Sequence, residues 1–196
     1  MRCVGMTVKI QVKKPLTHSL RIAVAIIVIF LCIGLLARFT NRQGGGSHET
    51  GWQVYFSPGG GCADAIVQTI AQAKDSIFVQ AYSFTSQPIA KALADAKKRG
   101  VTISIILDKD QQTDQYSEAN FLNHSDVRTL IDGEHAMNHN KVMVIDGETV
   151  ITGSFNFTSA ADEKNAENLL IIRDKALAQR YTENWYGRVF PCCQSK

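Results

Sequence analysis

The sequence predicts an α/β protein with one layered, mixed β-sheet flanked by helices, in a single domain that follows an N-terminal membrane segment. Segments with strand composition alternate with segments of helical periodicity, which is typical of layered α/β folds. Residues 101–107 form a near-continuous apolar run, as expected for a strand buried on both faces. Residues 142–152 have the pattern of a β-hairpin, which adds antiparallel pairing to the sheet.

The N-terminal part of the chain differs in charge from the rest. Residues 1–47 contain seven Lys or Arg and no Asp or Glu, which gives +7, whereas residues 48–196 contain 14 basic and 18 acidic residues, which gives −4. The net charge of +3 and the pI of about 8.6 are therefore basic because of the leader. They are no evidence for a nucleic-acid-binding surface on the folded domain.

An uncharged apolar run at 22–37 lies between Arg21 and Arg38. Its length falls between the apolar core of a signal peptide, about 7–15 residues, and a spanning helix, about 17–25 residues. No clear A-x-A cleavage site follows, so we expect an uncleaved signal anchor rather than a cleaved signal peptide. Because more Lys and Arg precede the run than follow it, we expect the domain to be exported. It would lie at the periplasmic face of the inner membrane, or be periplasmic or secreted if the leader is cleaved.

These features divide the chain into four parts. We expect a basic cytoplasmic N-terminus at 1–21, a transmembrane signal anchor or signal peptide at 22–40, a Gly-rich linker at 41–51 and a folded domain at 52–191. An exported domain keeps three cysteines, and an oxidising compartment would allow a disulfide from Cys62 to either Cys192 or Cys193. The sequence has no C-x-x-C pair, so a zinc site has little support.

Local patterns place the elements of the domain. Ile66, Ile70 and Ala73 recur at helical spacing, and Gly100 is placed to cap a helix at its C-terminus. In chain order we expect a strand at 52–56, a turn at 57–61, a helix at 62–74, a strand at 77–84, a helix at 87–99, a strand at 101–107, a polar and mainly helical excursion at 108–124, the hairpin, a strand at 167–172 and a closing helix at 174–189.

The hairpin at 142–152 gathers polar side chains. A turn at Asp146-Gly147 would pair Lys141 with Thr152, and a loop one residue later would slide the partners by two. Side chains alternate between the two faces of a strand, so only a slip of one residue would exchange the faces. Both registers place the same five side chains on one face: His139, Lys141, Thr152, Ser154 and Asn156.

This face combines an imidazole, an ammonium group, hydroxyls and an amide. Such a set suits an anionic tetrahedral centre, above all a phosphate. A neutral imidazole can attack phosphorus, and ammonium and amide donors can stabilise charge on the non-bridging oxygens. The alternative is a surface hairpin whose polar residues face solvent, because alternating apolar and polar residues are common.

The spacing of these residues resembles the HKD motif of the phospholipase D superfamily. Six residues match the pattern H-x-K-x4-D-x6-G-S-x-N: His139, Lys141, Asp146, Gly153, Ser154 and Asn156. Glu167, in E-K-N-A-E-N, stands where the family carries an acidic partner for the histidine. The segments F-S-P-G-G-G, Q-A-Y-S-F-T-S and K-K-R-G-V-T-I-S-I-I-L-D-K resemble the small bacterial Nuc-type endonucleases of that superfamily. The resemblance covers residues 54–185.

The resemblance implies a phospholipase D-like catalytic domain at 52–191 that cleaves phosphodiesters without a metal ion or another cofactor. His139 would attack phosphorus and form a phosphohistidine. In-line displacement also needs a proton donor on the far side of the phosphorus, and one imidazole cannot serve both sides at once. Larger members of the superfamily carry two HKD motifs and this chain has one. We therefore expect a homodimer that brings two copies of His139 to one phosphate.

The resemblance also suggests roles for the other residues of the motif. Lys141 and Asn156 would hold the non-bridging oxygens, with Ser154 in support. Glu167 would accept the far ring N–H of His139 and fix its tautomer, as the third member of a catalytic triad does. Two residues are expected to be structural, and these are Asp146 and Gly153.

Nucleic acid, either DNA or RNA, is the expected substrate, because Nuc-type relatives cut it with little sequence preference. A membrane phospholipid such as cardiolipin is the alternative, since other single-motif relatives act on phospholipid. A second alternative is a non-catalytic, membrane-tethered module that binds nucleic acid. The charge of −4 on residues 48–196 disfavours long-range attraction to nucleic acid.

Four other features carry weaker expectations. His135 and His139 would lie ~13 Å apart on a strand, so we do not expect them to share a metal ion. The glycines at 59–61 precede a helix and could cradle a phosphate, although a plain loop is the simpler interpretation. Asp108, Lys109 and Asp110 follow a buried strand, where ligand loops often lie, but a solvated loop is again the simpler interpretation. Two phenylalanines are expected in the core: Phe155 and Phe157.

Overall fold

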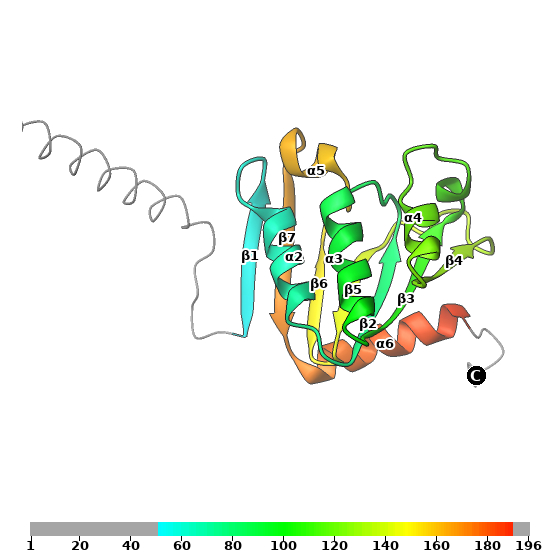
Figure 1. The fold of residues 1–196 in the computed structure, drawn as a ribbon. Helices are drawn as coiled ribbons and strands as arrows, with labels where there is room; N and C mark the ends of the chain where they lie inside the picture. The colour runs from blue at the N-terminus through cyan, green and yellow to red at the C-terminus, as the bar shows by residue number, and fades with distance from the viewer. Residues whose placement is uncertain (1–50, 190–196) are drawn as a thin grey trace, which may run out of the picture. The chain divides into compact units, whose positions relative to one another are not determined.

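The computed structural model describes residues 51–189, which form a seven-stranded β-sheet with helices on both faces (Figure 1). The order of the strands is β1-β7-β6-β5-β2-β3-β4. The strands are β1 (Trp52–Ser57), β2 (Ser76–Ala81), β3 (Thr102–Asp108), β4 (Arg128–Asp132), β5 (Lys141–Ile145), β6 (Thr149–Gly153) and β7 (Glu167–Arg173). The helices are α2 (Cys62–Ala71), α3 (Gln87–Lys98), the 3-10 helix η1 (Lys109–Gln112), α4 (Ala119–His124), α5 (Ser159–Glu163) and α6 (Lys175–Val189).

The predictions for the leader and for the tail cysteines fall outside the described residues. Within residues 51–189, no helix combines the length and the apolar character needed to cross a bilayer. Cys62 lies fully buried at the start of α2. Its burial, together with the nearby Asp162, raises the pKa of the thiol to about 11. This thiol stays protonated at neutral pH and is therefore a poor nucleophile.

The sheet is mixed, as the sequence predicts. β2, β3 and β4 pair in parallel, whereas every pair from β1 through β7, β6 and β5 to β2 is antiparallel. Each predicted strand and helix is present with slightly different ends, and β3 is buried along nearly its whole length. Two elements of five residues were not predicted, β4 and α5. The half-exposed edge strand β4 lacks the apolar run that made β3 recognisable.

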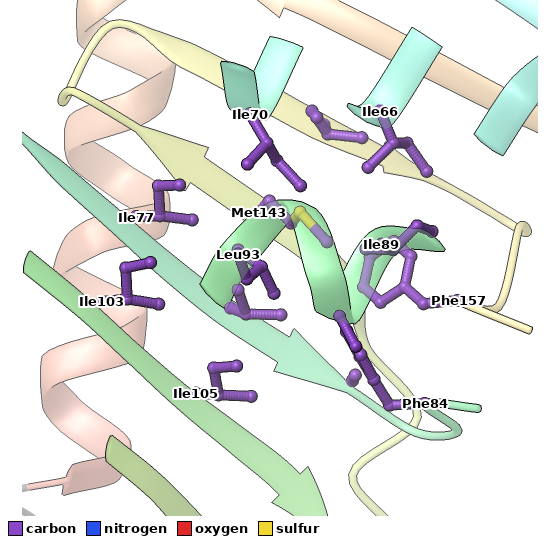
Figure 2. Packing of buried hydrophobic residues seen from close by; sticks show 14 of the residues in the cluster. Ile66, Ile70, Ile77, Phe84, Ile89, Leu93, Ile103, Ile105, Met143 and Phe157 are labelled. Atoms are coloured by element: carbon purple, nitrogen blue, oxygen red, sulfur yellow. The ribbon is translucent and has the colours of Figure 1, made fainter. Parts of the chain in front are cut away.

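Apolar side chains fill the space on both faces of the sheet. On one face, Ile66 and Ile70 of α2 and Ile89 and Leu93 of α3 pack around Met143 of β5 (Figure 2). On the other face, α6 packs over β2, β5 and β6. It covers three valines of the hairpin: Val142, Val144 and Val150. The hairpin is therefore central and buried, which excludes the alternative of a surface hairpin.

The hairpin turns where the sequence predicts, but its register differs from both predicted registers. The N–H of Glu148 donates to the carbonyl of Ile145 across the turn, at 3.1 Å. In the ladder, however, Ile145 pairs with Thr149, so Glu148 is an extra residue. The resulting shift of one residue exchanges the faces of β6. Thr152 consequently lies on the face that α6 covers, and its predicted place beside Lys141 was wrong.

A bulge at Gly153 compensates for this shift in the residues that follow. The N–H groups of Ser154 and Phe155 both donate to the carbonyl of Asn168, at 3.1 and 3.2 Å, which marks an extra residue in one strand. Gly153 has a φ of 148°, and a Cβ there would lie 2.3 Å from the same oxygen. Only glycine fits this position. Beyond the bulge, both phenylalanines are fully buried, as predicted: Phe155 and Phe157.

Asp146 connects the hairpin turn to the start of β2. Its carboxylate accepts the backbone N–H groups of Lys74, Asp75 and Ser76, at 3.0, 2.8 and 3.0 Å. Partial burial would raise the pKa of Asp146, but these three donors hold it below its usual range. Asp146 adopts a φ of 54°, in the left-handed region that Asp tolerates better than most residues.

We predict that Asp146→Asn lowers the free energy of unfolding by about 1–2 kcal/mol at neutral pH, because hydrogen bonds to a charged acceptor are the stronger ones. A depressed pKa gives stability that is complete above the pKa of the unfolded chain and is lost as the pH falls through the folded pKa. The difference between wild type and variant should therefore shrink as the pH falls below about 4. Denaturant unfolding across this range measures it, and a difference independent of pH would contradict the assignment.

Candidate active site

One open pocket lies where the chain enters β5 and leaves β6, next to the start of β7. Its volume is about 580 Å³. Seven residues line it: His139, Lys141, Gly153, Ser154, Asn156, Glu167 and Asn168. All five residues for which the sequence predicts a chemical role therefore lie together. Neither Thr152 nor the glycines at 59–61 belong to the lining.

Lys141 is a nearly buried cation in this pocket, with 8% of the residue exposed. Its Nζ donates to the backbone carbonyl of His139 at 3.0 Å and lies 5.0 Å from the centre of the Tyr82 ring. The Tyr82 ring also packs against the His139 imidazole, with ring centres 4.8 Å apart. Because an aromatic face attracts cations, Tyr82 can position both groups. Sequence reasoning missed this residue, although it lies in the segment Q-A-Y-S-F-T-S.

The electrostatics of the pocket favour an anionic ligand. Burial lowers the pKa of Lys141, and the negative charge of Glu167 opposes this effect. A desolvated ammonium group has lost much of its stabilisation by water, so a nearby anion interacts with it more strongly than it would in solvent. A phosphodiester oxygen is such an anion.

Ser154 and Glu167 form the fixed side of the pocket. The Ser154 hydroxyl donates to Glu167 Oε2 at 2.5 Å and accepts the backbone N–H of Asn168 at 3.1 Å. The second carboxylate oxygen of Glu167 accepts Asn165 Nδ2 at 3.1 Å. The hydroxyl proton of Ser154 is thus committed to Glu167. Ser154 is arranged to hold that carboxylate rather than to donate to a ligand.

The predicted hydrogen bond between Glu167 and His139 is not formed within residues 51–189. Both residues line the pocket, yet the two oxygens of Glu167 accept from Ser154 and Asn165. A carboxylate oxygen can accept a second hydrogen bond, so Glu167 keeps capacity for an imidazole N–H. Its role in fixing the His139 tautomer stays a prediction.

Asn156 brings an amide to the pocket from the chain just beyond the bulge. Its Oδ1 is buried and has no hydrogen-bond partner among the described residues. An unpaired buried acceptor costs roughly 1–3 kcal/mol, so the fold gains nothing from this oxygen. The same amide carries two donors at Nδ2, and these, unlike the Oδ1 acceptor, can bind an oxygen of an anionic ligand.

Two buried carboxylates hold the loop that delivers His139. Asp108, at the end of β3 and 1% exposed, accepts the backbone N–H of Asn138 at 2.6 Å. Asp132, at the end of the neighbouring β4, accepts the N–H groups of Glu134 and His135 at 3.2 and 3.3 Å. Asp108 is therefore a structural anchor for the residue before His139. The expectation of a solvated loop was wrong for Asp108, whereas Lys109 and Asp110 are exposed as expected.

The other histidine of this loop is engaged elsewhere. His135 Nδ1 lies 3.0 Å from the Asp132 carboxylate and 3.2 Å from Arg188 of α6. His135 therefore belongs to a cluster outside the pocket, and it does not share a site with His139. Across residues 51–189, no group of three or more His, Cys, Asp or Glu is placed to hold a metal ion.

The fold and the pocket define the class of protein: a mixed α/β protein whose central hairpin brings a histidine and a lysine to one open pocket. The family profile described as "cardiolipin synthase, PLD-like domain" matches residues 66–186. The chain belongs to this phospholipase D-like family. The resemblance seen in the sequence is thus confirmed for the fold and for membership of the superfamily.

Three relatives show the extent of the similarity. A protein named phospholipase D from Rickettsia typhi is 43% identical over 133 residues, which cover 68% of this chain and 65% of the relative. The chain thus spans slightly less than two thirds of that relative. A mitochondrial cardiolipin hydrolase from Xenopus tropicalis is 29% identical over 116 residues, 59% of this chain and 55% of the relative. The crystal structure of Nuc, a phospholipase D family member from Salmonella typhimurium, matches with a TM-score of 0.67 at 41% identity and covers 70% of this chain and 92% of Nuc.

We predict that Glu167→Gln lowers the pKa of Lys141, because the variant removes the negative charge that favours the ammonium form. The pKa is measured by an NMR titration of the chain with ¹³C-labelled lysine. Glu163→Gln is the matched control, since Glu163 is exposed on α5 and does not line the pocket. An unchanged Lys141 pKa in Glu167→Gln would show that the two groups are not coupled.

Proposed function

We propose that this chain is a metal-independent phosphodiesterase that cleaves nucleic acid as a non-specific endonuclease, through a phosphohistidine intermediate. The pocket carries the proposal, because it places the exposed imidazole of His139 beside the nearly buried ammonium group of Lys141 and the amide of Asn156. Lys141 supplies the fixed positive charge that a metal ion supplies in other phosphodiesterases.

In the proposed reaction, a ring nitrogen of His139 attacks phosphorus. An N–P bond forms while the bond to the leaving oxygen breaks, and that oxygen takes a proton from the partner subunit's His139. Water then attacks the phosphohistidine and gives its proton to the partner subunit's His139, which restores both imidazoles. Lys141 and Asn156 hold the non-bridging oxygens, Ser154 positions Glu167, and Glu167 offers an acceptor for an imidazole N–H.

The proposed site is shared by two copies of the chain. In-line displacement requires an attacking group and a proton donor on opposite sides of the phosphorus. Among residues 51–189, the pocket of one chain contains a single imidazole, His139, and His135 is bound to Asp132 and Arg188 outside it. A homodimer with a two-fold axis through the pocket supplies the second imidazole.

Nucleic acid is favoured over phospholipid as the substrate because the chain resembles Nuc-type endonucleases and is 41% identical to Nuc. Phospholipid stays the alternative because the relatives from Rickettsia typhi and Xenopus tropicalis are named phospholipase D and cardiolipin hydrolase. A non-catalytic module that binds nucleic acid is the second alternative.

The proposed location of the enzyme rests on the sequence alone. The apolar run at 22–37 and the basic residues before it support a domain exported to the periplasmic face of the inner membrane, with the membrane as a partner through the segment at 22–40. Cleavage of the leader would release the domain.

We predict that the full-length protein cleaves plasmid DNA or single-stranded RNA in the presence of EDTA and leaves cardiolipin vesicles largely intact. The three substrates are assayed in parallel. Hydrolysis of cardiolipin without cleavage of nucleic acid would support the phospholipid alternative instead. Loss of all activity in EDTA would contradict metal independence.

We predict that His139→Ala lowers this cleavage by at least about a thousandfold, because the attacking group and the proton donor are lost together. Circular dichroism checks that the fold persists. His124→Ala is the matched control and should retain activity. In the part of the chain that the structure describes, the ring of His124 bonds only to its own helix, at the carbonyl of Asn120. If His139→Ala cleaved nucleic acid as fast as wild type, His139 would be neither the attacking group nor the proton donor. The pocket would then have a binding function only.

A further inference from the structure

Tyr82 lies against both the imidazole and the ammonium group of the candidate active site. It directly follows β2, and its backbone N–H donates to the carbonyl of Asn140 at 2.9 Å, which fixes it beside the chain that enters β5. The centre of its ring lies 4.8 Å from the centre of the His139 ring and 5.0 Å from Lys141 Nζ. Tyr82 is half-buried and does not line the pocket. It can therefore act on a ligand only through these two neighbours.

Lys141 is a charged group in an unfavourable environment. With 8% of the residue exposed, its ammonium group has lost much of its water, and this burial lowers the pKa of Lys141. Two ionisable side chains share the pocket with it. The Glu167 carboxylate opposes the effect of burial, whereas the His139 imidazole adds a second positive charge whenever it is protonated. Among residues 51–189, no carboxylate forms a direct ion pair with Lys141.

The Tyr82 ring offers the interaction that an ion pair would otherwise supply. The face of an aromatic ring carries partial negative charge, and it attracts a cation that lies within about 6 Å of the ring centre. This attraction is stronger for a desolvated cation than for an exposed one, and Lys141 is desolvated. The same ring packs against the His139 imidazole at an angle of 56° between the two planes. One side chain thus restrains the cation and the imidazole together.

We propose that Tyr82 is a positioning residue of the reaction, whose ring keeps the Lys141 ammonium group charged and in place and holds the His139 imidazole beside it. This inference rests on the proposed cleavage of a phosphodiester, in which Lys141 binds a non-bridging oxygen. It adds to the site a side chain that lies outside the HKD motif.

Two explanations of Tyr82 predict opposite changes at Lys141. If the ring only fills space, its removal admits water to the ammonium group, and the smaller desolvation raises the pKa of Lys141. If the ring attracts the ammonium group, its removal lowers that pKa, because the charged form loses a favourable interaction. The sign of the change therefore separates a packing role from the proposed one.

The first test measures the pKa of Lys141 in the full-length chain in detergent, by an NMR titration of ¹³C-labelled lysine. The loss of a signal in Lys141→Met assigns it. We expect Tyr82→Leu to lower the pKa of Lys141 by about 0.5 or more. Tyr82→Phe keeps the ring and should leave the pKa as in wild type. Tyr116→Leu is the control for loss of a tyrosine elsewhere, since Tyr116 is 71% exposed and does not line the pocket.

A second set of variants keeps the shape of the side chain and changes only the charge of the ring face. Phenylalanine with one, two or three ring fluorines is incorporated at position 82 of the full-length chain. Each fluorine withdraws electrons from the ring face and so weakens its attraction for a cation. The pKa of Lys141 should therefore fall stepwise with the number of fluorines. This set decides the question even if Tyr82→Leu does not fold, which circular dichroism checks.

The same variants are assayed for cleavage of nucleic acid. We expect Tyr82→Leu to lower kcat by about tenfold or more with a smaller change in KM, because the charge on the non-bridging oxygens is stabilised most in the transition state. The alkaline limb of the pH–rate profile should move to lower pH, since activity is lost as the pH rises through the pKa of Lys141. Tyr82→Phe should keep both the rate and the profile of wild type.

An unchanged or raised pKa of Lys141 in Tyr82→Leu, or a pKa that does not depend on the number of fluorines, would overturn the proposal and make Tyr82 a packing residue. A lowered pKa with wild-type kcat would also overturn it, because the ring would then have no role in the reaction. Failure of the wild-type chain to cleave any phosphodiester would overturn the proposed function instead. The pKa measurements need no turnover, so the two failures are distinguishable.

Discussion

The backbone bulge at Gly153 is the constraint on which the rest of the site depends. The pairing of β5 with β6 is shifted by one residue from the register that would place the polar residues of the hairpin on one face. The bulge reverses the effect of this shift for the residues beyond Gly153. Ser154 and Asn156 consequently reach the pocket, while Phe155 stays in the core. A side chain at position 153 would collide with the carbonyl of Asn168. The glycine of the motif thus connects the packing of the core to the chemistry of the pocket.

The positive charge in the pocket is a local feature that differs in sign from the net charge of the domain. The domain is acidic overall, yet the pocket places a desolvated cation, Lys141, beside an imidazole and an amide. In such an environment a single charge acts more strongly than several exposed ones. Burial lowers the pKa of Lys141, and the Glu167 carboxylate opposes this effect. The Tyr82 ring, whose centre lies 5.0 Å from Nζ, adds a further attraction for the ammonium group. An acidic domain can therefore still provide a local site that suits one anion.

The sequence predicts most of the fold because strands and helices follow from local periodicity and from turn signals. It also predicts which residues line the pocket, since the spacing of the motif is specific. Register was the main error, because one extra residue at Glu148 reverses a face and no local signal marks it. Tyr82 was missed, and Asp108 was expected in a solvated loop, because their contacts lie far away in sequence. The hydrogen bond between Glu167 and His139 remains a prediction, since side-chain geometry does not follow from spacing.

The central claim is that one working site needs His139 from two copies of the chain. The most direct measurement mixes wild-type chains with His139→Ala chains, allows the subunits to exchange, and follows activity against the wild-type fraction. If both imidazoles are needed, activity follows the square of that fraction, so an equal mixture keeps about a quarter of the wild-type activity. Independent monomers would keep about half, and a linear dependence would contradict the account.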